Sequence, residues 1–176
     1  MHCGRLDPVP VDPADFAAAL RHHATGVALL TVRDDIDDVG TTVSALMSVS
    51  ADPPLVALGL AADGYPAEVL QAVGRGAVSL LGVQHAILAS RFASAGRPSA
   101  RHLLESVPWS RAPVSGAIVL DGALAALDGT VHSVVGAGDH VLVLLQVEEV
   151  PVLGDGDPLV RLRGRWTDPT GQPLRR

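Results

Sequence analysis

Lysine and asparagine are both absent from this 176-residue chain, so all 13 of its basic residues are arginines. The absence of lysine excludes every chemistry that needs a lysine amine, including a Walker-type phosphate loop, a Schiff base and a serine–lysine dyad. Cysteine occurs once, as Cys3. A single cysteine excludes an intramolecular disulfide and a thiolate-based zinc or iron–sulfur site within one chain.

Aromatic residues make up only 3 % of the chain, and the formal net charge is −6. This combination lacks the basic field and the stacking rings of nucleic-acid-binding proteins. Charged residues are also sparse, at 18 %, whereas hydrophobic residues reach 48 %, which excludes intrinsic disorder. No uncharged run reaches the length of a membrane span and the first residues contain no apolar signal core. We therefore expect no membrane association and a cytoplasmic protein.

The chain does contain short runs of Val, Leu and Ala, separated by 18 glycines and 13 prolines. This pattern favours strands and turns. Hairpin connections outnumber helical crossovers, which favours a closed or partly closed antiparallel barrel. The length fits one domain, predicted over residues 13–167, with a flexible arm at 1–12 and a tail at 168–176. Strands are predicted at residues 27–32, 41–46, 55–60, 77–81, 117–135 (with a break near 128–129), 140–150 and 159–166.

Helices are predicted at three places. Asp12 can cap a helix that begins at Pro13 and stops near Gly26. Residues 66–73 form a second candidate. The third covers 84–95, with apolar contacts expected from Ile87, Leu88, Ala89 and Phe92.

Several short motifs are weak signals. Gly74-Arg75-Gly76 lacks the third glycine of a dinucleotide fingerprint and precedes a strand, so we interpret it as a turn. The acidic run at 34–38 lacks the spacing of a calcium loop, and a solvated hairpin tip is the preferred interpretation. His22 and His23 point about 100° apart on a helix, and the other histidines show no ligand spacing, so we predict no metal site. The chain has no Gly-x-Ser-x-Gly elbow.

Two features could carry chemistry. Hydroxyl side chains are dense on one predicted strand and its exit, and Asp139-His140 follows a glycine at the start of an apolar strand. Taken alone, alternating hydroxyls are more often the solvent face of a strand. An Asp followed by a His at a turn is, taken alone, more often an ordinary surface turn.

Five blocks in chain order together resemble the flavin reductase family, the small reductase partners of two-component flavin monooxygenases. The longest is Gly-Thr-Thr-Val-Ser-Ala-Leu-Met-Ser-Val-Ser-Ala-Asp-Pro-Pro-Leu-Val at 40–56. The first is Ala-Thr-Gly-Val-Ala-Leu-Leu-Thr at 24–31, and Gln84 with Arg-Phe-Ala at 91–93 follows later. Gly-Asp-His at 138–140 and the ending Arg-Gly-Arg-Trp at 163–166 complete the set.

The resemblance implies an antiparallel Greek-key split β-barrel with a few flanking helices. It implies FMN, with FAD as the alternative, and NADH or NADPH as cosubstrate, in a homodimer that serves a partner monooxygenase. His140 is the implied catalytic residue, facing the dinucleotide with Arg163. The implied cofactor-binding residues are Gly40, Thr41, Thr42, Val43, Ser44, Ala45, Ser50, Gly59, Leu60, Ala61, Tyr65, Pro66, Gln84, Arg91, Arg163 and Trp166.

The chain departs from the family pattern in the loop at 62–67. There the family tends to place a basic residue and hydroxyls that bind the flavin phosphate, whereas this chain has Asp63 and Pro66. The function predicted first is an NAD(P)H:flavin oxidoreductase. The alternative is a flavin-binding split-barrel protein without reductase activity, used in a biosynthetic step or as a binding module. A split-barrel dimer that binds no flavin is a third alternative.

Overall fold

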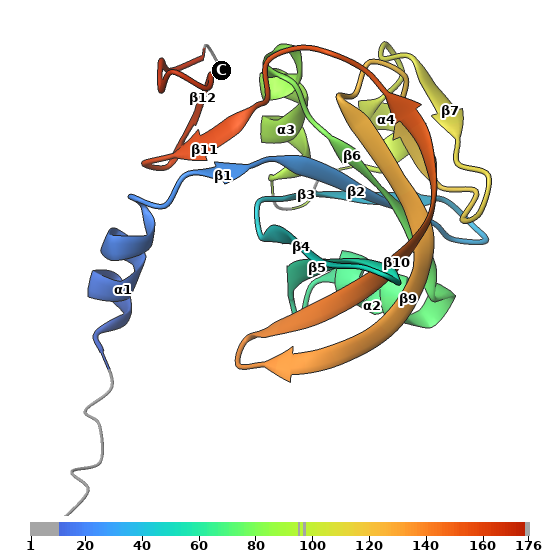
Figure 1. The fold of residues 1–176 in the computed structure, drawn as a ribbon, viewed down its shortest axis with the longest axis horizontal. Helices are drawn as coiled ribbons and strands as arrows, with labels where there is room; N and C mark the ends of the chain where they lie inside the picture. Colours follow the sequence, from blue (N-terminus) through green and yellow to red (C-terminus); the bar gives the residue numbers. More distant parts are fainter. Residues whose placement is uncertain (1–10, 95, 97, 175–176) are drawn as a thin grey trace, which may run out of the picture.

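Seven antiparallel strands form the main sheet of the computed structural model, which describes residues 11–94, 96 and 98–174. The long hairpin of β9 and β10 curves around the body of the molecule (Figure 1). In spatial order the strands are β3 (Asp38–Val43), β2 (Ala28–Arg33), β6 (Arg75–Leu80), β9 (Ala125–Ala137), β10 (His140–Leu153), β5 (Pro54–Ala61) and β4 (Leu46–Ala51).

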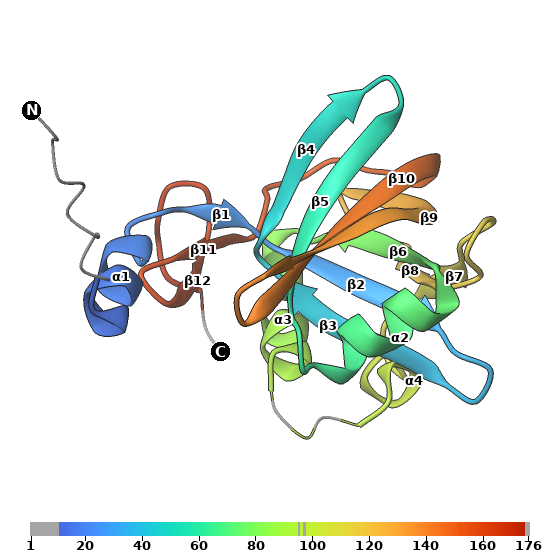
Figure 2. The same cartoon turned by 90° about the horizontal axis from the view of Figure 1, so that it is seen from below.

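The barrel remains split because its two edge strands, β3 and β4, do not pair with each other. They are consecutive in the chain, and only Ser44 and Ala45 connect them. The β4–β5 hairpin therefore projects away from the rest of the sheet (Figure 2). This geometry confirms the expected antiparallel, incompletely closed barrel.

The core lies on both sides of β2. Leu30 contributes to a cluster inside the barrel, which α2 (Tyr65–Val73) closes with Val69 and Leu70. Leu29 points the other way, into a cluster with Phe92 and residues of other flanking elements. Successive strand residues point to opposite faces, so a strand covered on both faces is apolar throughout.

Short elements cover the outer face of the sheet. They are η1 (Val83–His85), α3 (Ala86–Phe92), α4 (Ala100–Leu103), β7 (Trp109–Arg111) and β8 (Ile118–Leu120). A small separate sheet contains β1 (Thr25–Gly26), β11 (Val160–Leu162) and β12 (Arg165–Thr167). Beyond it, α1 (Pro13–Leu20) lies away from the barrel in both views (Figures 1 and 2).

Several predicted strand bounds were wrong. The strand at 41–46 ends at Val43, because the chain crosses there from one sheet edge to the other. The segment 117–135 is interrupted at residues 121–124 and not at 128–129, and it supplies both β8 and β9. The final strand at 159–166 is a hairpin of β11 and β12, with Arg163 in the left-handed region at its turn (φ 49°).

All three helices lie where they were predicted, and the segment 66–73 corresponds to α2, but the other two were predicted too long. Asp12 caps α1 by accepting a hydrogen bond from the Ala14 N–H at 2.7 Å, but α1 ends at Leu20 and not near Gly26. The helix predicted at 84–95 is η1 followed by α3, and Ile87 is 54 % exposed instead of buried.

Most of the predicted N-terminal arm, residues 1–10, lies outside the described residues. At the other end, Leu174 packs against the outer core cluster. No helix in the described part of the chain is long and apolar enough to cross a membrane.

Candidate functional site

The split in the barrel leaves two strand edges facing each other. β3 pairs with β2 along one edge, and no strand among the described residues pairs with its other edge. β4 covers β5 only as far as Leu58, so Leu60 and Ala61 extend beyond it. The Gly59 N–H already donates to the Ala45 carbonyl at 2.8 Å, and the Ala61 carbonyl accepts from the Gly64 N–H at 3.0 Å. The backbone groups on these edges that remain outside such bonds are the ones available to a ligand.

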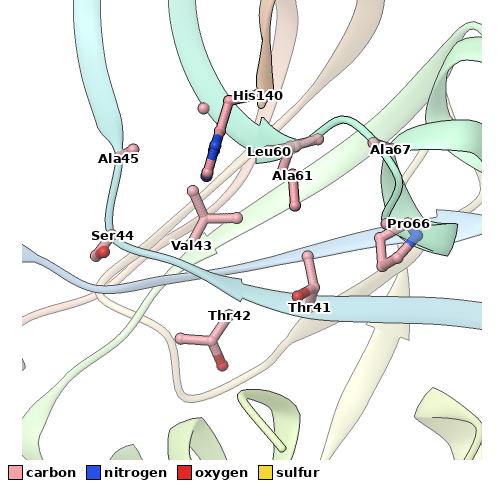
Figure 3. A pocket seen from close by; sticks show the side chains of 12 residues that line it. Thr41, Thr42, Val43, Ser44, Ala45, Leu60, Ala61, Pro66, Ala67 and His140 are labelled. Atoms are coloured by element: carbon pink, nitrogen blue, oxygen red, sulfur yellow. The ribbon is translucent and has the colours of Figure 1, made fainter. Parts of the chain in front are cut away.

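A pocket of about 370 Å³ lies between these edges, a volume typical of small-molecule sites. Figure 3 shows side chains from β3, β5, α2 and β10 around it. Its lining consists of Thr41, Thr42, Val43, Ser44, Ala45, Gly59, Leu60, Ala61, Gly64, Pro66, Ala67 and His140.

Alternation along β3 divides its side chains between two faces. Thr41 points toward the side of Pro66 and Ala61, whereas Thr42 points to the opposite side (Figure 3). The Thr42 hydroxyl donates a hydrogen bond to the carbonyl oxygen of Ala89 in α3 at 2.8 Å. The hydroxyls of this strand therefore do not all point to the same face. The Thr42 hydroxyl is hydrogen-bonded to α3.

His140 lies at the mouth of the pocket, at the first position of β10 opposite Ala61. Its imidazole extends toward Val43 (Figure 3). Nδ1 lies 2.7 Å from a carboxylate oxygen of Asp139, and this hydrogen bond is the main cause that lowers the pKa of Asp139. The backbone carbonyl of Asp139 also accepts from the Ala62 N–H at 3.0 Å, which ties the turn to the end of β5. The carboxylate thus orients the ring while Nε2 is left for a ligand.

A second groove, of about 420 Å³, lies on the other face of β3 and shares Thr42 and Ser44 with the pocket. Trp166 donates from its indole nitrogen to the Ser90 hydroxyl at 2.6 Å. The guanidinium of Arg161 lies 4.5 Å from the centre of the Trp166 ring, within range of a cation–π contact.

Four predicted cofactor-binding residues do not line the pocket. A Cβ on Gly40 would meet the Phe92 ring, so this glycine permits close packing of α3. The Ser50 hydroxyl accepts from the Asp52 N–H at 3.2 Å within the β4–β5 turn. Gln84 donates to the Gly122 carbonyl at 3.1 Å, and Arg91 is exposed near the end of α3.

Three other predicted residues also lie outside the lining of the pocket. Tyr65 is 58 % exposed and lines an adjacent hollow. Trp166 lines the second groove. Arg163 lines neither, and its backbone N–H donates to the Arg21 carbonyl at 2.9 Å. The arginine of this segment that lines the second groove is Arg161.

Sequence reasoning missed several residues of both grooves. Gly64 and Ala67 line the pocket without chemical side chains, so no residue pattern marks them. Ser90 and Ser94 are spaced four residues apart, which is a helical signal for one shared face. Arg161, two residues before Arg163, could have been selected by strand alternation. In the described ranges, no group of three or more His, Cys, Asp or Glu residues could hold a metal ion.

The residues present fit the flavin that the resemblance implies. Gly59 and Ala45 face each other so closely that a Cβ on Gly59 would lie 3.0 Å from that of Ala45. This close approach requires that Gly59 lack a side chain, which leaves the backbone of β5 bare at this point of the pocket. The polar edge of an isoalloxazine needs alternating donors and acceptors, and the unpaired edges of β3 and β5 carry such groups.

Comparison with known proteins gives a consistent result. The family model described as "Flavin reductase like domain" matches residues 20–168. Among curated relatives, the chain is similar to the actinorhodin polyketide dimerase of Streptomyces coelicolor, with 39 % identity over 84 % of this chain and 81 % of the relative. It is 34 % identical to the NADH-dependent FMN reductase AsuE2 of Streptomyces nodosus subsp. asukaensis, over 87 % of this chain and 83 % of that protein.

A third relative is the reductase component of the 4-hydroxyphenylacetate 3-monooxygenase of Thermus thermophilus. It is 36 % identical over 82 % of this chain and 89 % of its own length. Among solved structures, the flavin reductase component BorF of a bacterial two-component tryptophan halogenase superposes with a TM-score of 0.83. That match has 27 % identity and covers 93 % of this chain and 100 % of BorF.

Proposed function

The chain belongs to the flavin reductase-like domain family, and we propose that it transfers hydride from NADH to FMN and delivers the reduced flavin to a partner monooxygenase. The observation that carries the proposal is the open pocket between the unpaired edges of β3 and β5, with His140 at its mouth. The names of the similar reductases support NADH and FMN as the substrate pair. They favour a reductase over a flavin-binding module without reductase activity.

Bound flavin supplies the hydride acceptor, so the chain's own task is to bind and orient. Backbone groups of residues 41–45 and 59–61 would hold the polar edge of the ring. The Ser44 hydroxyl lies where β3 crosses to β4 and would contact the ribityl chain or ring. Fixing two flat reactants in contact converts a bimolecular step into an intramolecular one, which accounts for much of such a rate enhancement.

His140 would contact the nicotinamide dinucleotide from the mouth of the pocket. Hydride transfer to the flavin needs no protein base in that step, so the imidazole acts by positioning. His140→Ala should raise the KM for NADH or lower kcat while the FMN dissociation constant changes by no more than about two-fold. His132→Ala is the matched control, because His132 is an exposed histidine on β9 outside the pocket. Lost FMN binding with normal NADH kinetics would assign His140 to the flavin.

The activity itself is tested with purified protein. NADH oxidation, followed at the nicotinamide absorbance band, should require added flavin and should support turnover of an added flavin-dependent monooxygenase. Flavin binding without NADH oxidation would refute the reductase function and favour the flavin-binding alternative. Because NADH is an intracellular reductant, the proposal places the protein in the cytoplasm.

A homodimer belongs to the same proposal. α1 buries none of its residues, and Phe16 and Leu20 are 56 % and 53 % exposed. Leu20 and the 59 % exposed Met47 also line an apolar groove of about 450 Å³ that reaches Ser44. A second copy of the chain would cover these side chains, each worth about 1.5–3 kcal/mol when fully buried.

Light scattering tests the dimer directly. The double variant Phe16→Glu/Leu20→Glu should be a folded monomer, because neither side chain contributes to the core. Ile36→Glu, at a hairpin tip with Ile36 90 % exposed, should remain a dimer. A parent protein that is monomeric at high concentration would refute this part of the proposal.

A further inference from the structure

A separate polar groove lies where the β2–β3 hairpin turns back. It has a volume of about 400 Å³ and shares no lining residue with the pocket that contains His140. Two arginines, two aspartates of the hairpin tip and the turn at residues 113–116 line it, and we call it the hairpin groove. The hairpin tip and the loop after β7 lie at the end of the molecule opposite α1 in both views (Figures 1 and 2).

The strand register places the two arginines of this groove opposite each other. Arg33 is the last residue of β2, and Arg75 is the first residue of β6. Thr31 pairs with Ala77 in this antiparallel pair of strands, so the same register two residues further along brings Arg33 opposite Arg75. Both lie on the outer face of the sheet, as does Thr31, whose hydroxyl donates to the Ile118 carbonyl. Like charges at facing positions of neighbouring strands repel each other.

The buried carboxylates near these arginines are bonded to other groups. In the described ranges, neither guanidinium of the hairpin groove forms a salt bridge. Asp38 is the cross-strand partner of Arg33, but its carboxylate binds two arginines of the outer elements instead. Asp128 is fully buried and accepts from two backbone N–H groups of the turn at 113–116, at 2.6 and 3.1 Å. The charge of the two groove arginines is therefore left to solvent or to a ligand.

One wall of the hairpin groove holds an arginine in place. Gly116 lies in the left-handed region (φ 68°), and its N–H donates to the Ala112 carbonyl at 3.0 Å. Its carbonyl accepts from Arg111 at 3.0 Å. A Cβ at Gly116 would lie 3.3 Å from both Cδ and Nη1 of Arg33, so the missing side chain lets this guanidinium lie against the turn. A cation positioned in advance lowers the cost of ordering it when a ligand binds.

The two aspartates of the groove oppose an anion from the hairpin tip. The Asp34 carboxylate accepts a hydrogen bond from the Asp35 N–H at 2.7 Å and is thus turned toward its own backbone. Asp35 is exposed. Both would repel an anion in the groove, so they limit its affinity.

We propose that the hairpin groove is a binding site for a phosphate-class oxyanion, held between the guanidiniums of Arg33 and Arg75. A guanidinium fork matches a phosphate in geometry and charge, and an anion placed between two facing cations removes their repulsion. Both arginines are exposed, so the site is accessible to inorganic phosphate and to the phosphate group of a small ester. This site is independent of the flavin pocket and goes beyond the proposed function.

Calorimetric titration of inorganic phosphate into the flavin-free, full-length protein tests the proposal, with chloride used to hold the ionic strength constant. Phosphate should bind, and at about ten times its Kd it should raise the Tm by about 3–6 °C. Chloride at the same ionic strength should give no comparable rise. Equal rises in both salts would overturn the proposal, because general screening of charge would then explain the effect.

Single substitutions locate the bound anion. Arg33→Gln and Arg75→Gln should each weaken phosphate binding by about ten-fold or more, because each removes a hydrogen bond between two charged groups. Arg165→Gln is the matched control, because Arg165 is an exposed arginine on β12 outside the groove, and it should bind phosphate like the parent. Parent-like affinity in either groove variant would overturn the proposal.

Stability without phosphate separates a ligand site from a structural ion pair. In phosphate-free buffer of low ionic strength, both groove variants should be at least as stable as the parent, because each removes one of two facing like charges. A fall in Tm of several degrees would overturn the proposal, because the lost guanidinium would then have bound a carboxylate of the protein itself. Asp35→Asn should tighten phosphate binding several-fold, since it removes a repelling charge, and weaker binding would contradict the assignment.

A second ligand identifies the source of the phosphate group. Glycerol 2-phosphate that binds at least as tightly as inorganic phosphate would assign the groove to phosphate esters, whereas binding of inorganic phosphate alone would assign it to the free ion. Failure of both to bind would overturn the proposal. The outcome does not depend on the proposed function, because a protein that binds phosphate here without oxidising NADH would retain this site and refute only the reductase activity.

Discussion

Asp38 is the buried carboxylate on which the outer elements of the fold depend, and its removal should have a large effect. Its side chain has no exposed surface at the start of β3. Arg111 of β7 donates to both carboxylate oxygens, at 2.5 and 2.9 Å, and Arg101 of α4 donates through Nε at 2.5 Å. The sequence analysis placed Asp38 in a solvated hairpin tip, and the structure shows this to be wrong for Asp38.

The magnitude follows from the exposure of the partners. Asp38→Ala removes a bidentate, charge-assisted contact with Arg111, whose side chain is 31 % exposed and so only partly regains water. Hydrogen bonds to charged groups contribute about 1.5–3 kcal/mol, and we expect Asp38→Ala to cost about 2–3 kcal/mol. Arg101 is half exposed and adds little. For a domain of this size, each kcal/mol of lost stability lowers the Tm by about 2–4 °C, so the Tm should fall by about 4–12 °C.

The pH dependence has a defined sign. Burial raises the pKa of Asp38, but the hydrogen bonds from Arg111 and Arg101 outweigh it and hold the pKa below its ordinary value of 3.8. The unfolded chain therefore binds this proton first as the pH falls. The stabilisation is fully present above the unfolded value and is lost as the pH drops through the lowered folded value. Asp38→Asn should remove this part of the acid-side loss.

Urea unfolding of the parent, Asp38→Ala, Arg111→Met and the double variant measures the coupling directly. We expect the double variant to cost less than the sum of the single variants, because either change alone breaks the same contact. A loss below about 1 kcal/mol in Asp38→Ala, or strictly additive losses, would refute the reasoning.

Three further predictions address the site, the pH response and the sheet. Thr42→Val should cost about 0.5–1.5 kcal/mol of stability, because the Thr42 hydroxyl donates to a carbonyl of α3. Ser44→Ala should leave the Tm unchanged and weaken FMN binding several-fold. Unchanged affinity in a flavin titration would remove Ser44 from the site. Burial lowers the pKa of His85, so the unfolded chain takes up the proton first, and stability should fall as the pH drops from about 6.5 toward the lowered folded pKa. Thermal scans should show a weaker fall in His85→Gln, and an equal fall in both proteins would contradict this. Gly129→Ala should cost about 3 kcal/mol, because its Cβ would lie 1.8 Å from a carbonyl oxygen of β10, whereas Gly136→Ala, with nothing near its Cβ, should be tolerated in the same denaturation assay.

Local patterns were sufficient to predict most elements. The apolar run at 27–32 corresponds to β2, and Asp12 caps α1 as expected. These signals succeed because capping and strand alternation involve residues only a few positions apart. The family resemblance added the idea that residues 41–45, 59–61 and His140 share a site, and the structure brings them to one pocket.

Other features could not be predicted, because they depend on partners distant in the chain. Asp38 resembles its acidic neighbours in the sequence, and only the return of Arg101 and Arg111 makes it a buried ion pair. Likewise, the sequence does not show whether Arg161 or Arg163 lines a groove, because the two arginines are only two residues apart. In the structure, Arg163 lies in the left-handed turn between β11 and β12, and Arg161 lines the second groove.

The sequence by itself determined the class of the fold, the exclusion of lysine chemistry and of thiolate-based metal sites within one chain, and the lack of cationic residues in the loop at 62–67. Each of these is a matter of which residues are present and in what local order. The tertiary structure alone decided that β3 and β4 remain unpaired at opposite edges of one sheet. Edge pairing depends on how seven strands curve together and on how short the crossing at Ser44 and Ala45 is, which no local pattern encodes. That unclosed split exposes the backbone groups from which the proposed flavin site is built.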